Sequence, residues 1–367
     1  MRLLILLTLA LVSIPHARAS TGYTFIKADA QKKITYRNPV WSPSGYSIAY
    51  TAVHDSDKIA GGIWNVPRDL WLATLKNGHW SHRLLVKGAD GSAWSNDGKE
   101  LAISRKGLAV LDLSIGKVRQ LTSDYIPGVS GSDEGRIHID FPISFSPNGR
   151  YLAYERELYE SSEYRVFDLA KGKDSGVRLG MHPVWSADGK RIYSAYKWYA
   201  DWPVKTRLVR TSIETGKTET VLKGYRIDWL ALPGSDYAWA LVDHPQPPTP
   251  PDSMDYPKDE FEPPAGRGIY RLNLTTRKLT KLLGVKEGEV IHLSPDLKRF
   301  AFFSKPAELS QPATLYAGMT SDWRYGTAAT DAAQPWMIQT IPASWSADGK
   351  SLAYVTNAGD IRVVKPD

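Results

Sequence analysis

The chain has 367 residues, no cysteine, and 46 Lys and Arg against 39 Asp and Glu, which gives a formal net charge of +7. The lack of cysteine excludes disulfide bonds and lipid attachment through a cysteine, so stability must come from apolar burial. The basic residues are spread along the chain without a Lys/Arg run, which argues against a nucleic-acid partner.

Residues 1–19 have the three parts of a secretory signal peptide. Arg2 provides the positive start, Leu3 to Ile14 the apolar core, and Ala17-Arg18-Ala19 the small-x-small cleavage site. The apolar core is too short for a good membrane span, and no later stretch approaches ~18 apolar residues. We expect cleavage before Ser20, export to the periplasm or cell exterior, and no membrane-spanning segment. A buried N-terminal helix is the alternative interpretation.

A short motif recurs along the rest of the chain. An aromatic residue or Leu precedes a tetrad of the Ser-Pro-Asp-Gly type, and an apolar run such as Leu352-Ala353-Tyr354 follows it. Clear copies begin at Trp41, Trp94, Phe145, Trp185, Leu293 and Trp345. The copies recur about every 40 to 53 residues, but the interval between Trp185 and Leu293 is about twice as long. A degenerate copy around Trp229 fits that interval, so seven repeats are predicted.

Each repeat contains strand signals separated by turn signals. In the tetrad, Ser suits the first position of a type I turn, Pro presets φ, and Gly accepts the left-handed position that follows. The turn therefore predicts a hairpin, and third and fourth apolar runs complete each unit. Four strands in about 40–53 residues are typical of a propeller blade. The predicted fold is all-β, a seven-bladed β-propeller of four-stranded antiparallel blades, with six blades as the alternative.

The last repeat ends one strand short. After the strand signals at Ser351 to Thr356 and Asp360 to Val364, no fourth strand follows. The preceding segment 21–36 contains strand-like stretches, so we expect it to supply the outer strand of blade seven and close the ring. Residues 20–367 are thus predicted to form one propeller domain, with an insertion rich in Pro and acidic residues at about 243–267. Whether blade five is complete stays open.

The tetrads followed by an apolar-Ala-Tyr run resemble the propeller repeat of TolB, which also occurs in tricorn-type and prolyl-oligopeptidase-type propellers. The resemblance covers nearly the whole mature chain. TolB carries an additional α/β domain before its propeller, whereas this chain has only about 20 residues there. Prolyl-oligopeptidase relatives carry a hydrolase domain, but Gly128-Val129-Ser130-Gly131-Ser132 lacks the final Gly of a nucleophile elbow. The resemblance implies a free-standing exported propeller.

Long connections are predicted on one face only, because the turns from strand two to three and from blade to blade share a face. They comprise Val53–Arg68, Thr122–Phe141, Lys197–Thr206, Asp243–Arg267 and Lys305–Ala313. Loops on a rigid scaffold commonly carry binding function, and exposed aromatic residues are typical interface anchors. The candidate binding residues in these loops are Trp64, Lys197, Trp198, Tyr199 and Trp202. A local cap over the blades is the alternative role of the aromatic residues.

Polar residues are expected at the mouth of the central channel, next to the ends of the first and second strands. The candidates are Arg37, Asn38, Asp90, His138, Asp140, His182, Glu289, Glu155 and Arg156. His54-Asp55 and His138-x-Asp140 each offer possible metal ligands, but neither has a ligand-spacing signature. No metal or cofactor is therefore predicted, and an unremarkable polar channel lining is an open alternative.

The repeated Trp and Asp of the tetrads are interpreted as packing and turn residues, since a functional residue need not recur in each blade. Because Leu297 replaces the Gly of one tetrad, that turn is expected to be altered or strained. The leading functional hypothesis is a monomeric, non-catalytic scaffold that binds a protein or cell-envelope component through the long-loop face. The alternative is a channel-mouth enzyme, such as a polysaccharide lyase or hydrolase, that uses His138, Asp140 and His182.

Overall fold

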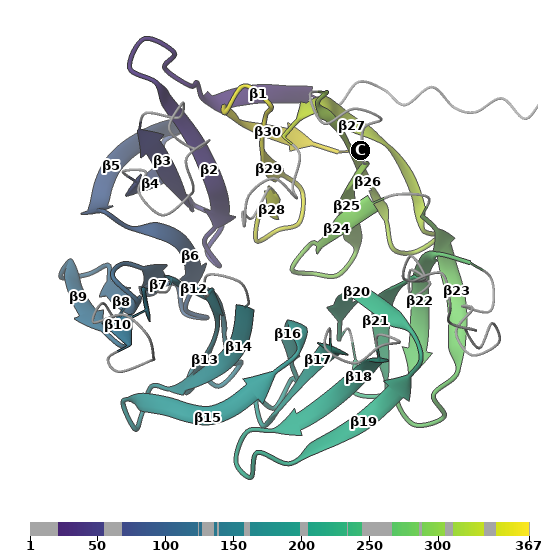
Figure 1. Ribbon diagram of the computed structural model, residues 1–367. Helices are drawn as coiled ribbons and strands as arrows, with labels where there is room; N and C mark the ends of the chain where they lie inside the picture. The colour runs from purple at the N-terminus through teal and green to yellow at the C-terminus, as the bar shows by residue number, and fades with distance from the viewer. Residues whose placement is uncertain are drawn as a thin grey trace, which may run out of the picture.

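A computed structural model describes most of the chain after the predicted signal peptide. The described residues are 21–54, 68–123, 125–126, 136–137, 139–157, 162–198, 205–232, 234–243, 266–285, 288–304, 311–333 and 343–366. They form seven four-stranded antiparallel sheets arranged in a ring (Figure 1). The predicted seven-bladed β-propeller is thus confirmed, and the six-bladed alternative is wrong. The described residues include no helix that is long and apolar enough to cross a membrane.

The first three blades follow one another around the ring, each running from an inner strand to an outer one. Blade 1 consists of β2 (Ile34–Trp41), β3 (Ser47–His54), β4 (Arg68–Lys76) and β5 (His79–Lys87). Blade 2 consists of β6 (Asp90–Trp94), β7 (Glu100–Ser104), β8 (Leu108–Asp112) and β9 (Lys117–Gln120). Blade 3 consists of β12 (Ile139–Phe145), β13 (Tyr151–Glu157), β14 (Ser162–Asp168) and β15 (Lys173–Leu179). Between blades 2 and 3, the short strands β10 (Tyr125–Ile126) and β11 (Arg136–Ile137) pair with each other.

The next three blades repeat this order, and blade 5 is complete. Blade 4 consists of β16 (Met181–Trp185), β17 (Arg191–Trp198), β18 (Lys205–Ser212) and β19 (Thr218–Lys223). Blade 5 consists of β20 (Arg226–Ala231), β21 (Tyr237–Asp243), β22 (Gly268–Asn273) and β23 (Leu279–Gly284). Blade 6 consists of β24 (Gly288–Leu293), β25 (Arg299–Ser304), β26 (Ala313–Met319) and β27 (Arg324–Ala332). The predicted seventh repeat therefore exists, but Ala231 rather than Trp229 ends its inner strand.

Blade 7 joins the two ends of the described chain. Its inner strands are β28 (Ala343–Trp345), β29 (Leu352–Val355) and β30 (Ile361–Lys365), and its outer strand is β1 (Thr21–Ile26), which lies beside β30 in Figure 1. The predicted closure by the N-terminal segment is thus confirmed for residues 21–26. The second strand-like stretch, 34–36, instead begins β2 of blade 1, because a turn ending at Lys33 reverses the chain between the two strands.

The tetrads form the turns that their residue types predict. In blade 4, the Gly189 N–H donates to the Ser186 carbonyl (2.8 Å), and Asp188 Oδ1 accepts from Ser186 Oγ (2.6 Å) and from the Lys190 N–H (3.0 Å). Leu297 takes the glycine position of its tetrad with a left-handed φ of 58° and makes the same turn bond to Ser294 (2.8 Å). The prediction was an altered or a strained turn. The turn bond is kept, and the left-handed backbone of the leucine is a source of strain.

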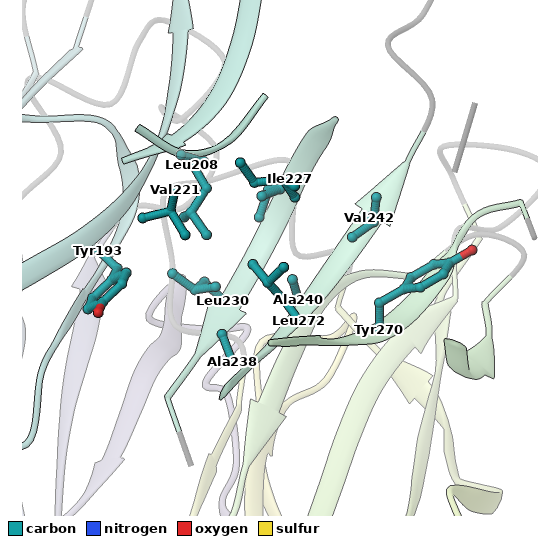
Figure 2. Close-up of a cluster of buried hydrophobic side chains, with 12 residues drawn as sticks. Tyr193, Leu208, Val221, Ile227, Leu230, Ala238, Ala240, Val242, Tyr270 and Leu272 are labelled. Atoms are coloured by element: carbon teal, nitrogen blue, oxygen red, sulfur yellow. The ribbon is translucent and has the colours of Figure 1, made fainter. Parts of the chain in front are cut away.

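The apolar core is divided among the interfaces between blades. Each of the seven buried clusters draws its residues from two adjacent blades. Figure 2 shows one such cluster, in which Tyr193 and Leu208 of blade 4 face Leu230 and Leu272 of blade 5. The tetrad tryptophans also join blades, as Trp345 shows by donating from Nε1 to the carbonyl of His292 in the preceding blade (3.0 Å). The packing role inferred for these tryptophans is thus confirmed.

Candidate functional site

The longest connections of the propeller leave one face of the ring. They join strands two and three of a blade, as at 55–67, 199–204 and 244–267, or one blade to the next, as at 121–138 and 333–342. The opposite face carries the tetrad turns and is called the tetrad face below; by the bounds of the described strands, no connection there is longer than 346–351. The predicted asymmetry between the two faces is therefore present in the strand boundaries.

The inner strands extend closer to the long-loop face than the sequence suggested. In β2, β6 and β16 the pairing register shifts three residues before the tetrad tryptophan. The residues at these bulges, Asn38, Gly91 and His182, have left-handed φ values of 54°, 56° and 52°. A β-bulge re-aims the side chains around it, and pairing resumes beyond it. Arg37, Asp90 and Asp140, expected just before the inner strands, therefore lie within them.

One group of predicted residues meets at the junction of blades 1 and 2. Asp90, the first residue of β6, accepts hydrogen bonds from Arg37 Nη2 (2.7 Å), Asn38 Nδ2 (2.9 Å) and Arg68 Nη1 (2.8 Å). Arg37, Asn38 and Asp90 are all buried. Burial alone would raise the pKa of the Asp90 carboxyl, but the positive charges of Arg37 and Arg68 outweigh it, so the pKa lies below its usual value.

A second group ties blade 2 to blade 3. Arg156 of β13 donates from Nε and Nη2 to the two carboxylate oxygens of Asp140 (2.7 and 2.8 Å), and the Thr122 hydroxyl donates to Asp140 as well. The Asp140 carboxylate is fully buried. Burial would lower the pKa of the Arg156 guanidinium, but its hydrogen bond to Asp140 and the charge of that carboxylate outweigh this effect and raise it. This bidentate pair holds the start of β12 against the end of β13.

Other candidates lie on strands of blades 3 and 4. His182 lies on the inner strand of blade 4, and Glu155 is half-buried in β13. Lys197 and Trp198 are the last two residues of β17, paired in register with Thr206 and Lys205, so they belong to a strand rather than to a loop. The strand is longer than predicted because its pairing with β18 continues to that point.

Several predictions fall outside the described residues. These are Trp64, Tyr199, Trp202 and His138, the insertion at 244–265, and the signal peptide. Asp55 also lies outside these residues, whereas His54 lies next to Asp69, with Nε2 3.0 Å from Oδ2. Within the described ranges, no group of three or more His, Asp or Glu side chains is arranged to hold a metal ion.

The arrangement of the two buried groups favours a structural role, in which they hold the strand ends in place, over proton transfer in catalysis. A general acid or base works best with a pKa near the operating pH, whereas Asp90 is held ionised by two guanidinium groups. Two members of these groups were missed by sequence reasoning, namely Arg68 and Thr122. Arg68 directly follows the connection 55–67 and Thr122 follows β9, so both lie at the roots of long connections. They could have been identified only by knowing which strands become neighbours in the fold.

No protein-family model matches the chain, and the search of curated proteins found no match. Among solved structures, the chain is similar to oligogalacturonate lyase in complex with manganese, at 13% identity and a TM-score of 0.64, covering 96% of this chain and 98% of that one. It is also similar to the β-propeller domain of the Trilobed protease from Pyrococcus furiosus, at 12% identity and a TM-score of 0.54, covering 94% and 95%. TolB from Acinetobacter baumannii matches at 14% identity and a TM-score of 0.39, covering 91% and 55%.

Similarity at 12–13% identity shows a shared fold and no activity. The matched proteins differ in what their names say they do: one is named as a lyase and another as the propeller domain of a protease. By fold, this protein is a seven-bladed β-propeller, and it is similar in fold to a lyase and to the propeller domain of a protease.

Proposed function

We propose that the protein is an exported, non-catalytic binding scaffold that engages a protein or cell-envelope component through its long-loop face. The observation that carries this proposal is that buried ion pairs hold the roots of the long connections. Arg68 directly follows the connection 55–67, and Asp140, the second residue of β12, follows the connection 121–138 and is held by Arg156. Each of these residues belongs to a buried group that joins two blades.

Fixed loop roots suit a binding surface. Ordering a loop on association costs free energy, and a scaffold that already fixes both ends of the loop reduces that cost. Removing one partner of a buried ion pair typically costs about 3–5 kcal/mol, so these roots resist displacement. The predicted signal peptide supports a place in the periplasm or outside the cell.

The experiment is recovery of partners from the native cell envelope with purified mature protein as bait. Trp198 ends β17 and Trp202 lies in the connection after it, so the double variant Trp198→Ala, Trp202→Ala should lose the recovered partner at unchanged melting temperature. Tyr46→Ala is the matched control, because Tyr46 is an aromatic residue 65% exposed on the tetrad face. Equal recovery by parent and double variant would contradict the proposal.

A channel-mouth enzyme is the second candidate. It is favoured by His182, which places a titratable side chain at the inner-strand bulge that Asn38 and Gly91 occupy in other blades. A metal analysis and an oligosaccharide activity screen on the pure protein distinguish the two functions. Turnover that is lost on chelation and on His182→Ala would favour the enzyme.

A further inference from the structure

A groove opens on the tetrad face between blades 3 and 4, on the side of the ring opposite the long loops. Its volume is about 730 Å³. It is lined by the tetrad turns of both blades and by the turns that join β14 to β15 and β18 to β19. Five cationic side chains line it, all of them exposed: Arg150, Lys171, Lys173, Lys190 and Arg191.

The acidic residues of the groove neutralise only part of this charge. Asp168 accepts from Arg150 (3.1 Å) and lies 4.0 Å from Lys171, whereas Asp174 pairs with Arg165 (3.0 Å). Glu214 is close enough to Arg150 to act on its charge. Among the residues that the structure describes, no carboxylate lies within ion-pair distance of Lys173, Lys190 or Arg191, but the Asp188 carboxylate of the blade 4 tetrad is near enough to act on Lys190 and Arg191. Because Asp174 is already paired with Arg165, the five cations are opposed by Asp168, Glu214 and Asp188, which leaves a small surplus of positive charge.

One substitution in the repeat contributes to this surplus. In the blade 2 tetrad, the carboxylate next to the turn glycine sits beside the cation that follows, with Asp97 3.5 Å from Lys99. In blade 3 the position is Asn148, which makes the same bonds: it accepts from Ser146 Oγ (2.7 Å) and from the Arg150 N–H (3.1 Å). The turn geometry is kept and the negative charge is removed, at a tetrad that lines the groove.

We propose that this groove binds an acidic polysaccharide segment whose sugars carry carboxylates. Exposed Lys and Arg side chains from two blades would pair with successive carboxylates. Ser175, Ser212 and Asn148 offer hydrogen-bonding groups for sugar hydroxyls. This site is separate from the long-loop face and does not depend on the function proposed for that face.

The apolar content of the groove argues against an acidic peptide as its ligand. Protein interfaces centre on aromatic and apolar anchors that are fully desolvated. Here Ile213 is buried in the core, and the Tyr151 ring is stacked on Trp185. The Arg150 guanidinium lies 5.0 Å from the centroid of the Tyr151 ring. None of the exposed large hydrophobic residues lines the groove. A hydrophilic polyanion matches what this surface offers.

The test measures binding of three probes to the mature protein at low salt: a uronic acid hexamer, a neutral glucose hexamer and hexaglutamate. We expect the uronate hexamer to bind most tightly and to weaken as salt rises, because exposed charge pairs are screened. The triple variant Lys173→Gln, Lys190→Gln, Arg191→Gln should weaken uronate binding about tenfold or more. Asn148→Asp should weaken it about threefold, since it restores a negative charge without changing the turn.

The matched control is Asp348→Asn in the tetrad of blade 7, which makes the same exchange in reverse, far from the groove. It should leave uronate binding unchanged. The proposal is overturned if the uronate hexamer does not bind, or if the triple variant and Asn148→Asp bind it as the parent does. Equal or tighter binding of hexaglutamate would replace the polysaccharide by an acidic peptide. Trp198→Ala, Trp202→Ala should not affect this binding, so the two proposals fail separately.

Discussion

Leu297 is the residue whose backbone carries an identifiable conformational cost. It occupies the left-handed region that Gly45, Gly98, Gly149, Gly189 and Gly349 occupy in the other tetrads. A left-handed conformation costs an L-residue about 1–2 kcal/mol, and glycine avoids this penalty at an entropic cost of about 0.5–1 kcal/mol. Leu297→Gly should therefore raise the free energy of unfolding by about 0.5–1 kcal/mol, as measured by denaturant unfolding.

The control for this prediction is Leu297→Ala. Alanine keeps a Cβ atom and therefore the same backbone penalty, so it should bring no gain in stability. A gain of equal size in both variants would show that the side chain, and not the left-handed backbone, is the source of the cost.

His292 of β24 should make the stability of the protein depend on pH. Its Nε2 is buried without a hydrogen-bond partner, and its ring lies edge-on to Phe303 at 6.0 Å. Burial lowers the pKa of this imidazole from 6.5 to about 4. Between these values the unfolded chain binds a proton that the folded chain does not. Stability is therefore complete above pH 6.5 and falls as the pH drops toward 4, by up to about 3 kcal/mol.

The measurement is the free energy of unfolding of parent and His292→Gln between pH 7.5 and 4.5. His82, whose pKa is also lowered by burial, has the same sign of effect and is present in both proteins. The difference between the two curves therefore isolates His292. Parallel curves for the two proteins would contradict the prediction.

At the scale of elements, β1 is the strand that completes blade 7. It pairs with β30 from Thr21 to Ile26, and its Phe25 packs against Trp80 of blade 1 at 4.9 Å. Deletion of residues 20–26 would expose the edge of β30 and remove Phe25 from the blade 7–blade 1 cluster. Burial of one such aromatic residue is worth about 3 kcal/mol or more. The melting temperature should therefore fall by at least about 5 °C.

Two point variants check that the effect belongs to closure. Phe25→Ala should reproduce much of the loss, whereas Tyr23→Ala should change stability little, because Tyr23 is 45% exposed on the same strand. An unchanged melting temperature on deletion would mean that β30 does not need its outer partner.

The strands show which features sequence patterns can predict. The tetrads specify their turns through local bonds, so the hairpins, the blade count and the closing strand follow from residue types and spacing. The bulges at Asn38 and His182 could not be predicted in this way, because neither residue type by itself indicates a left-handed φ within an inner strand. Because pairing resumes beyond the bulges, the inner strands begin earlier in the sequence than predicted. The candidate residues therefore lie inside these strands.

At the scale of the whole molecule, the same limit applies to the site. Candidate residues at the channel mouth could be named from their positions in the repeat. Their partners depend on which strands become neighbours: Arg68 of β4 reaches Asp90 of β6, and Thr122 reaches Asp140 across a blade boundary. The groove between blades 3 and 4 was missed for a related reason. Its charge arises from a missing acid at Asn148 and from cations of two blades.

The ring as a whole has no blade with a core of its own, because all seven clusters are shared between neighbours. A cavity made in one cluster therefore weakens the contact between two blades. Loss of any one blade would leave two apolar faces open to water. Folding of the described ring should accordingly be cooperative, with blade 7 completing it last or together with the rest.

The antiparallel pairing of β1 with β30 also determines how the ring responds to mechanical load. Thr21 lies opposite Lys365, so the two ends of the described chain leave the molecule side by side. Tension applied to these ends would separate β1 from β30 one residue pair at a time, beginning at Thr21 and Lys365. The strand that resists heat by completing a sheet is thus the strand that a pulling force would detach first.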